Sequence, residues 1–221
     1  MGDIVSSPQP VASADIGIPP LGLAGTLSLP ERPLGLVVFA HGSGSSRLSP
    51  RNTAVAEALN GRGFGTLLFD LLTSAEEADR ANVFDISLLA DRLVDVISWL
   101  VRQEARIGGF RIGLFGASTG AAAALVAAAR IPERIAAVVS RGGRPDLAGD
   151  ALPMVRAPTL LIVGGDDFGV IELNEQALGR LRAPKAIEII PGATHLFPEP
   201  GALDAVIALA ARWFERHLVE P

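Results

Sequence analysis

The sequence predicts an α/β fold: a mostly parallel central sheet of about seven to eight strands, with helices on both faces and no cap domain. Short apolar runs bounded by Gly or Pro alternate with longer helical patterns, which is typical of parallel strands joined by helices. Several runs are unbroken stretches of Val, Leu, Ile or Phe, as expected of strands buried on both faces. The length of 221 residues fits a single domain, residues 1–221.

Seven apolar runs are candidate strands, and a stretch near residues 11–16 is expected to pair with the first run as an antiparallel edge. The seven candidate strands cover residues 24–29, 36–40, 65–69, 112–115, 135–139, 159–163 and 186–190.

Three helices can be placed between and after these strands. Ser49 and Pro50 predict a helix N-terminus, because Ser is a favoured N-cap and Pro fits the first turn; this helix should stop near Gly61 and Gly63. Apolar residues three and four apart across 86–101 predict an amphipathic helix that packs on the sheet. A second amphipathic helix is expected over residues 203–217.

The composition argues against several classes of function. Nineteen Lys and Arg against 24 Asp and Glu give a net charge of −5, so we expect no nucleic-acid partner. Without Cys the chain has no disulfide, thiolate cluster or Cys nucleophile. With three His, any metal site would depend on carboxylates.

No targeting or membrane segment is expected. Residues 1–10 lack the basic and apolar regions of a secretory signal, so we expect a cytoplasmic location. The uncharged stretch 112–129 is long enough to be considered as a membrane helix, but Gly, Ser and Thr interrupt its first half. This pattern favours a strand, a turn and a buried helix.

A candidate nucleophile, Ser118, lies in a G-x-S-x-G motif at residues 116–120. The motif directly follows the strand 112–115 and precedes a helix at 121–130, the context in which it forms a nucleophile elbow. Gly at both ends permits the close approach that this strained turn requires. The alternatives are a glycine-rich turn that only lets the helix pack closely, and a phosphate-binding loop, which would lack G-x-G-x-x-G and a Lys.

The candidate general base is His195. A serine hydroxyl needs a base to take its proton and a carboxylate to orient that base, in the chain order Ser, acid, His. His41 precedes Ser118, and His217 lies in the last turn of a charged helix end, where a cation suits the helix dipole. This leaves His195, in the loop that follows the strand 186–190.

The acid is expected just after the strand 159–163, at Asp167, with Asp166 as the alternative. A turn after the strand tip carries the acid beyond the last apolar position, and Val170 then returns inward. Asp70 is a third carboxylate on the same sheet edge, and we expect it to hydrogen-bond the loop that follows it.

The small-residue loop 41–46 is the candidate for half of an oxyanion hole. We expect one donor to be the backbone N–H of Ser43 in this loop and the other to be the N–H of Thr119. A flexible Gly/Ser turn is the alternative.

Residues 140–158 are too few for a helical cap, so the site should be open and favour small or exposed acyl groups. Arg141 and Arg144 in this segment are candidate ligands of an anionic substrate. Arginines that are solvated or paired with acids are the alternative.

Four motifs resemble the α/β-hydrolase superfamily, and within it the compact dienelactone-hydrolase-like group; the resemblance covers nearly the whole chain. They lie at residues 41–44, 116–120, 164–167 and 192–195. In this family the acid lies in a G-x-x-D pattern, which implies Asp167.

Three positions depart from dienelactone hydrolases proper, and they make dienelactone itself a doubtful substrate. Ser118 replaces the nucleophilic Cys, Gly42 corresponds to a Glu, and Glu199 to a carboxylate-binding Arg. The resemblance therefore implies a serine esterase.

We expect a carboxylic-ester hydrolase that acts on a small-molecule ester through an acyl-enzyme, as a monomer or homodimer, with no cofactor and no metal. A thioesterase, a lactone (dienelactone-type) hydrolase or an acyltransferase would use the same triad. A non-catalytic module that binds a small molecule or a protein is the alternative from a different class.

Overall fold

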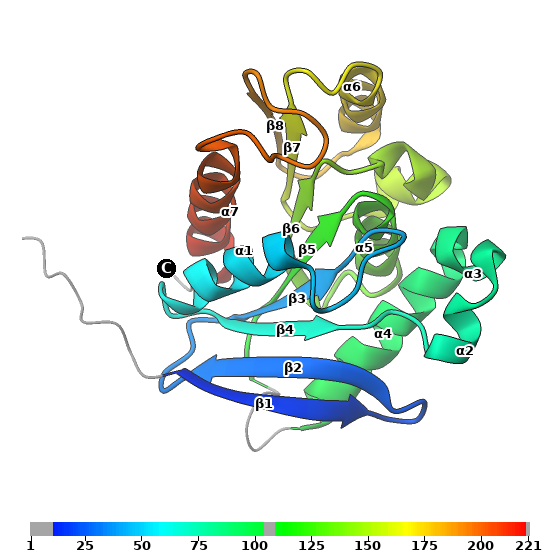
Figure 1. The fold of residues 1–221 in the computed structure, drawn as a ribbon, viewed down its shortest axis with the longest axis vertical. Coiled ribbons are helices and arrows are strands. Elements are labelled where there is room, and N and C mark those ends of the chain that lie inside the picture. Colours follow the sequence, from blue (N-terminus) through cyan, green and yellow to red (C-terminus); the bar gives the residue numbers. More distant parts are fainter. Residues whose placement is uncertain (1–10, 104–108, 220–221) are drawn as a thin grey trace, which may run out of the picture.

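A single sheet of eight strands runs through the computed structural model, which describes residues 11–103 and 109–219 (Figure 1). Their order is β1-β2-β4-β3-β5-β6-β7-β8. β1 and β2 pair antiparallel with each other, β2 pairs antiparallel with β4, and the remaining neighbours are parallel. The strands are β1 Val11–Ile18, β2 Leu23–Pro30, β3 Leu36–Ala40, β4 Gly65–Phe69, β5 Ile112–Ala117, β6 Ile135–Arg141, β7 Thr159–Gly164 and β8 Lys185–Ile190.

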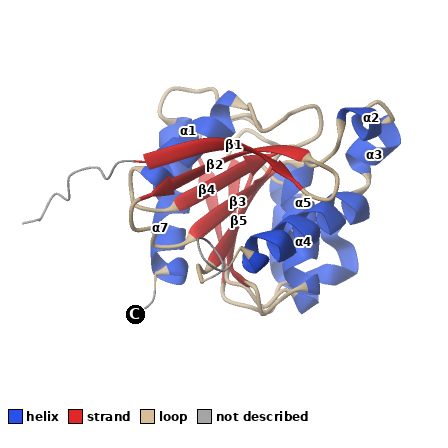
Figure 2. Ribbon diagram, turned by 90° about the horizontal axis from the view of Figure 1, so that it is seen from below, coloured by secondary structure: helices blue, strands red, loops and turns tan. Residues whose placement is uncertain are grey.

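Helices cover both faces of the sheet, with α1 and α7 on one side and α4 and α5 on the other (Figure 2). The bounds are α1 Pro50–Asn60, α2 Ser74–Glu77, α3 Arg80–Phe84, α4 Ile86–Arg102, α5 Thr119–Arg130, α6 Val170–Arg180 and α7 Ala202–Leu218, with a 3-10 segment, η1, at Pro145–Met154.

Alternation along the buried strands divides the core into two layers. In β3, Val38 packs in the layer of α4 and α5, whereas Val37 and Phe39 pack in the layer of α1 and α7. Leu114 and Phe115 divide in the same way in β5. Since successive side chains of a strand point to opposite faces, one continuous apolar run can serve both layers.

The predicted fold class is confirmed, with the strand bounds shifted by small amounts. β3 and β4 begin and end where the sequence predicts, while β5 continues to Ala117 and β6 to Arg141. Ser49 caps α1 through its side chain, which accepts a hydrogen bond from the N–H of Asn52. Between β6 and β7 the described chain forms only η1, as expected for a fold without a cap domain.

No helix among residues 11–103 and 109–219 has both the length and the apolar character needed to cross a membrane. The uncharged stretch 112–129 forms β5, the turn at Ser118 and most of α5, and most of its residues are buried.

Two glycines allow the first turn of α5 to lie directly on the sheet. A Cβ atom on Gly120 would lie 2.2 Å from the carbonyl oxygen of Ala40, at the end of β3. A Cβ atom on Gly116 would lie 2.4 Å from the Cα atom of Ala121. Both distances are far shorter than van der Waals contact, so each position excludes a side chain.

We expect Gly120→Ala to lower the free energy of unfolding by about 1–3 kcal/mol or more, because the added methyl group meets backbone that does not move easily. The matched control is Gly179→Ala in α6, where a Cβ atom has nothing within 4 Å. There the substitution should be neutral or stabilise by roughly 0.5–1 kcal/mol. Urea unfolding of the three proteins measures both effects, and equal stability of the two variants would contradict the packing argument.

Candidate active site

Ser118 lies on a strained turn between β5 and α5, with φ 51° and ψ −124°. Residues other than glycine rarely adopt a positive φ, and those held in this conformation tend to cluster at functional sites. In the described part of the chain only two non-glycine residues do so, Ser118 and Phe197. Phe197 follows the candidate base, His195, by two positions, so both strained residues lie in segments that carry predicted site residues.

The predicted base and acid are in contact. His195 Nδ1 donates a hydrogen bond to Asp167 Oδ2 over 2.8 Å. The side chain of His195 is 36% exposed and that of Asp167 is 11% exposed. With its proton on Nδ1, the ring keeps Nε2 free to accept a proton from a neighbour.

The carboxylate that bonds His195 is that of Asp167 and not that of Asp166, the alternative acid. Asp166 is exposed, and its backbone N–H donates to the carbonyl oxygen of Ala193 over 2.9 Å. A Cβ atom on Gly164, which begins the turn, would lie 2.3 Å from the same carbonyl oxygen, so the β7 and β8 turns are in close backbone contact.

The turn after β6 lies against both Ser118 and His195. The N–H of Ser118 donates to the carbonyl oxygen of Arg141 over 3.4 Å. A Cβ atom on Gly142 would lie 2.8 Å from the carbonyl oxygen of His195 and 3.7 Å from its Nδ1. Ser118 Oγ makes no hydrogen bond within the described residues. In enzymes without bound substrate, the hydrogen bond between a nucleophile and its base is often long and tightens only in the reacting complex.

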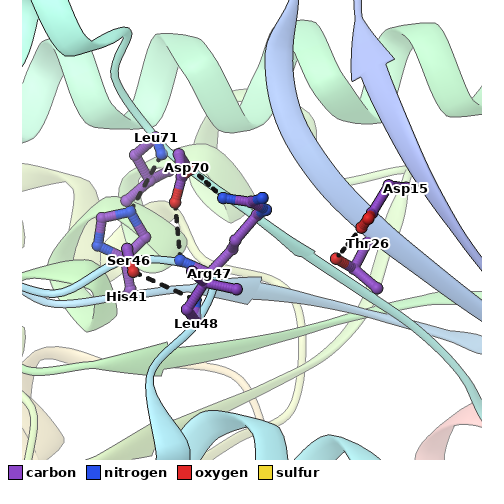
Figure 3. Close-up of polar contacts among 8 residues, drawn as sticks. All are labelled: Asp15, Thr26, His41, Ser46, Arg47, Leu48, Asp70 and Leu71. Atoms are coloured by element: carbon purple, nitrogen blue, oxygen red, sulfur yellow. Dashed lines mark hydrogen bonds and ion pairs between the residues drawn. The ribbon is translucent and has the colours of Figure 1, made fainter.

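Two side chains hold the loop that follows β3, residues 41–49, against the end of β4 (Figure 3). His41 Nδ1 donates to the carbonyl oxygen of Gly42 over 3.0 Å, and its Nε2 accepts the N–H of Leu71 over 3.1 Å. Asp70 accepts two hydrogen bonds from Arg47, one from the backbone N–H at 2.7 Å and one from Nη1 at 3.0 Å. Asp70 therefore binds the loop that precedes it in the chain, which corrects the expectation that it bonds the following one.

The two predicted oxyanion donors lie next to each other, but one of them already has a partner. The N–H of Ser43 donates to the side-chain Oγ1 of Thr119 over 2.9 Å. Thr119 is the first residue of α5, at the positive end of the helix dipole. The sequence motifs predict these backbone groups but not the Thr119 hydroxyl that accepts the bond.

The two candidate substrate arginines differ in their surroundings. Arg144 donates to both carboxylate oxygens of Asp146 over 2.9 and 2.8 Å, and these hydrogen bonds raise the pKa of Arg144. Arg141 is 5% exposed at the end of β6, where its Nη2 donates to Asn52 over 3.3 Å. Burial, and then the neighbouring Arg51, lower the pKa of Arg141 to about 10.

Glu199, where the resemblance implied that an arginine is replaced, accepts a hydrogen bond from the hydroxyl of Thr194 over 2.6 Å. This bond lowers the pKa of Glu199. Among residues 11–103 and 109–219, no group of three or more His, Asp or Glu could hold a metal ion.

Comparison with known proteins identifies the family. A family model described as "alpha/beta hydrolase fold" matches residues 35–160, more than half of the chain. The chain belongs to the α/β-hydrolase family. The crystal structure of a dienelactone hydrolase from Anabaena variabilis is 53% identical to this chain, with a TM-score of 0.90 over 96% of this chain and 100% of that one.

Other relatives share the fold or a part of their length. Est1E from Butyrivibrio proteoclasticus is 17% identical, with a TM-score of 0.74 over 94% of this chain and 99% of that one, which shows the common fold alone. A Mycobacterium tuberculosis protein named "Putative phosphoribosyl transferase" is 60% identical over 202 residues. These residues cover 91% of this chain but only 45% of that relative, so this chain spans less than half of the relative's length.

The bond between His195 and Asp167 predicts a downfield ring N–H signal in proton NMR, because a hydrogen bond to a carboxylate is short and strong. We expect Asp167→Asn to remove or strongly shift this signal, and Asp166→Asn, the matched control in the same turn, to leave it in place. The reverse pattern would make Asp166 the partner of His195.

Proposed function

We propose that the chain is a serine hydrolase, a carboxylesterase that cleaves small esters through an acyl-enzyme. The observation that carries the proposal is the hydrogen bond of 2.8 Å between His195 and Asp167, formed at the sheet edge where Ser118 is held in a strained conformation. An oriented imidazole next to an elbow serine is the arrangement that activates a hydroxyl nucleophile.

In the first half of the reaction, Ser118 Oγ attacks the ester carbonyl carbon. His195 Nε2 takes the hydroxyl proton, an Oγ–C bond forms, and the π electron pair of the carbonyl moves to its oxygen. Asp167 stabilises the imidazolium, and donors at the start of α5 bind the oxyanion. The intermediate collapses when the C–O bond to the leaving group breaks, and the alkoxide takes the proton from His195.

In the second half, a water molecule attacks the acyl-enzyme. His195 now accepts a proton from the water, and the second tetrahedral intermediate releases the carboxylic acid as Ser118 Oγ recovers its proton. The chemistry requires no cofactor or metal.

A small pocket lies beside the oxyanion loop, residues 41–46. Its lining includes Gly42 and Ser43 of the loop together with Leu72, Val83 and Leu89, and its volume of about 20 Å³ is little more than the space a single water molecule needs. The support for a small or exposed acyl group is instead the open site, since the described chain between β6 and β7 forms only η1 and no cap.

The comparisons support a hydrolase, because residues 35–160 match the α/β-hydrolase family and a dienelactone hydrolase is 53% identical over 96% of this chain. The transferase name belongs to a relative of more than twice the length, of which this chain covers 45%. Thioester or lactone hydrolysis and acyl transfer use the same intermediate and remain the closest alternatives.

We expect Ser118→Ala to abolish hydrolysis of p-nitrophenyl acetate and butyrate while leaving the unfolding transition unchanged. The residual rate should lie at least about 10³-fold below that of the wild type. Ser98→Ala, in α4, is the control and should retain activity.

A fluorophosphonate probe, which reacts quickly only with an activated serine, separates an enzyme from a binding module. Labelling of the wild type and not of Ser118→Ala supports the proposal. A folded wild type that neither hydrolyses esters nor takes the label would be a binding module.

The charges around Arg141 support a substrate that carries an acidic group. No carboxylate among the described residues pairs with Arg141 or Arg51, and the Nε atoms of both are buried without a partner. Arg144, by contrast, is neutralised by Asp146. An unpaired guanidinium attracts carboxylates and phosphates.

We expect Arg141→Met to lower kcat/KM for a p-nitrophenyl hemisuccinate about tenfold or more relative to the uncharged butyrate, because one charge-assisted interaction is lost. Arg144→Met is the matched control and should change this ratio little. The ratio of kcat/KM values cancels general effects on the catalytic machinery, and an unchanged ratio for Arg141→Met would contradict an acidic substrate.

A further inference from the structure

An oxyanion hole made of the backbone N–H groups of Ser43 and Thr119 gives no role to the side-chain hydroxyl of Thr119. It accepts the N–H of Ser43 over 2.9 Å, across 76 residues of sequence. Thr119 is 6% exposed, so its side chain is held in place by its surroundings. While this contact persists, the N–H of Ser43 points at Thr119 and not at a substrate.

Backbone packing brings these two residues together. A Cβ atom on Gly120 would lie 2.2 Å from the carbonyl oxygen of Ala40 and 2.5 Å from that of His41. The first turn of α5 therefore lies against the start of the oxyanion loop, residues 41–46. His41 and Asp70 also hold the loop, through hydrogen bonds with Leu71 and Arg47.

A hydroxyl that accepts one hydrogen bond still has its own proton to donate. No acceptor for the Thr119 proton is found within residues 11–103 and 109–219. The N–H of Ser43 also polarises the hydroxyl, since hydrogen bonds in a chain strengthen one another. The free proton belongs to the residue directly after Ser118, next to the place where negative charge develops.

We propose that the side-chain hydroxyl of Thr119 is a catalytic group that donates a hydrogen bond to the oxyanion. Thr119 then supplies two donors, its backbone N–H and its Oγ1–H, and Ser43 orients and polarises the hydroxyl. The inference rests on the proposed esterase function. In the opposing arrangement, Thr119 turns away when substrate binds and the N–H of Ser43 contacts the oxyanion directly.

The test compares Thr119→Val, which removes the hydroxyl at nearly constant shape, with Thr119→Ser, which keeps it. The substrate is p-nitrophenyl butyrate. We expect Thr119→Val to lower kcat about 10²-fold with little change in KM, because an oxyanion donor acts in the transition state. Thr119→Ser should recover most of the lost rate. A trifluoromethyl ketone, which forms a tetrahedral adduct with Ser118, should lose affinity for the valine variant in parallel.

Two further variants separate catalysis from folding. Thr159→Val removes another buried hydroxyl, at the start of β7, which donates to the carbonyl oxygen of Ala157. This variant should leave kcat unchanged. Thr119→Ala makes the same deletion as the valine variant without a branched side chain, which provides the measurement if Thr119→Val does not fold.

The two proposals fail in different ways. An active wild type whose Thr119→Val and Thr119→Ala variants are equally fast or faster would overturn the role of the hydroxyl and favour direct donation by Ser43. A wild type with no hydrolysis and no fluorophosphonate label would overturn the esterase function, and the inference with it.

Discussion

The close contact between the first turn of α5 and the end of β3 is the constraint on which the site depends. With Gly120 facing the carbonyl oxygen of Ala40, no side chain separates the helix from the sheet. The loop that follows β3 therefore begins beside the N-terminus of α5, where Ser118 is the N-cap residue. The strained φ of 51° at Ser118 is stabilised by this surrounding packing. The same contact places the hydroxyl of Thr119 against Ser43.

A second set of contacts fixes the parts of the site that have little apolar packing of their own. The loop of residues 41–49 is rich in Gly and Ser, and its order comes from His41 and Asp70. In the same way, the loop after β8 is held by the turn after β6, where Gly142 lies under His195. Polar contacts from neighbouring strand ends thus replace the packed core at the edge that carries the candidate site.

A feature of the structure is predictable from the sequence when the residues that determine it lie close together in the chain. β3 and β4 are predicted to the residue, since glycines and polar residues bound each apolar run. β6 is predicted too short because Ser140 and Arg141 continue the strand ladder despite being polar. The pairing of His195 with Asp167 follows from a motif order, but the partners of Asp70 and Thr119 lie 23 and 76 residues away. No local pattern encodes those contacts.

The electrostatics of the site follow from the same placement. The positive end of α5 and the guanidinium groups of Arg141 and Arg51 act together at this edge of the sheet. Even with its pKa lowered to about 10, Arg141 stays a cation near neutral pH. Such a field favours the oxyanion that the proposed mechanism forms next to α5. Asp167, 11% exposed, is hydrogen-bonded to the His195 ring and places a negative charge at the same edge. In the proposed mechanism this contact holds the ring with its Nε2 available to the hydroxyl of Ser118.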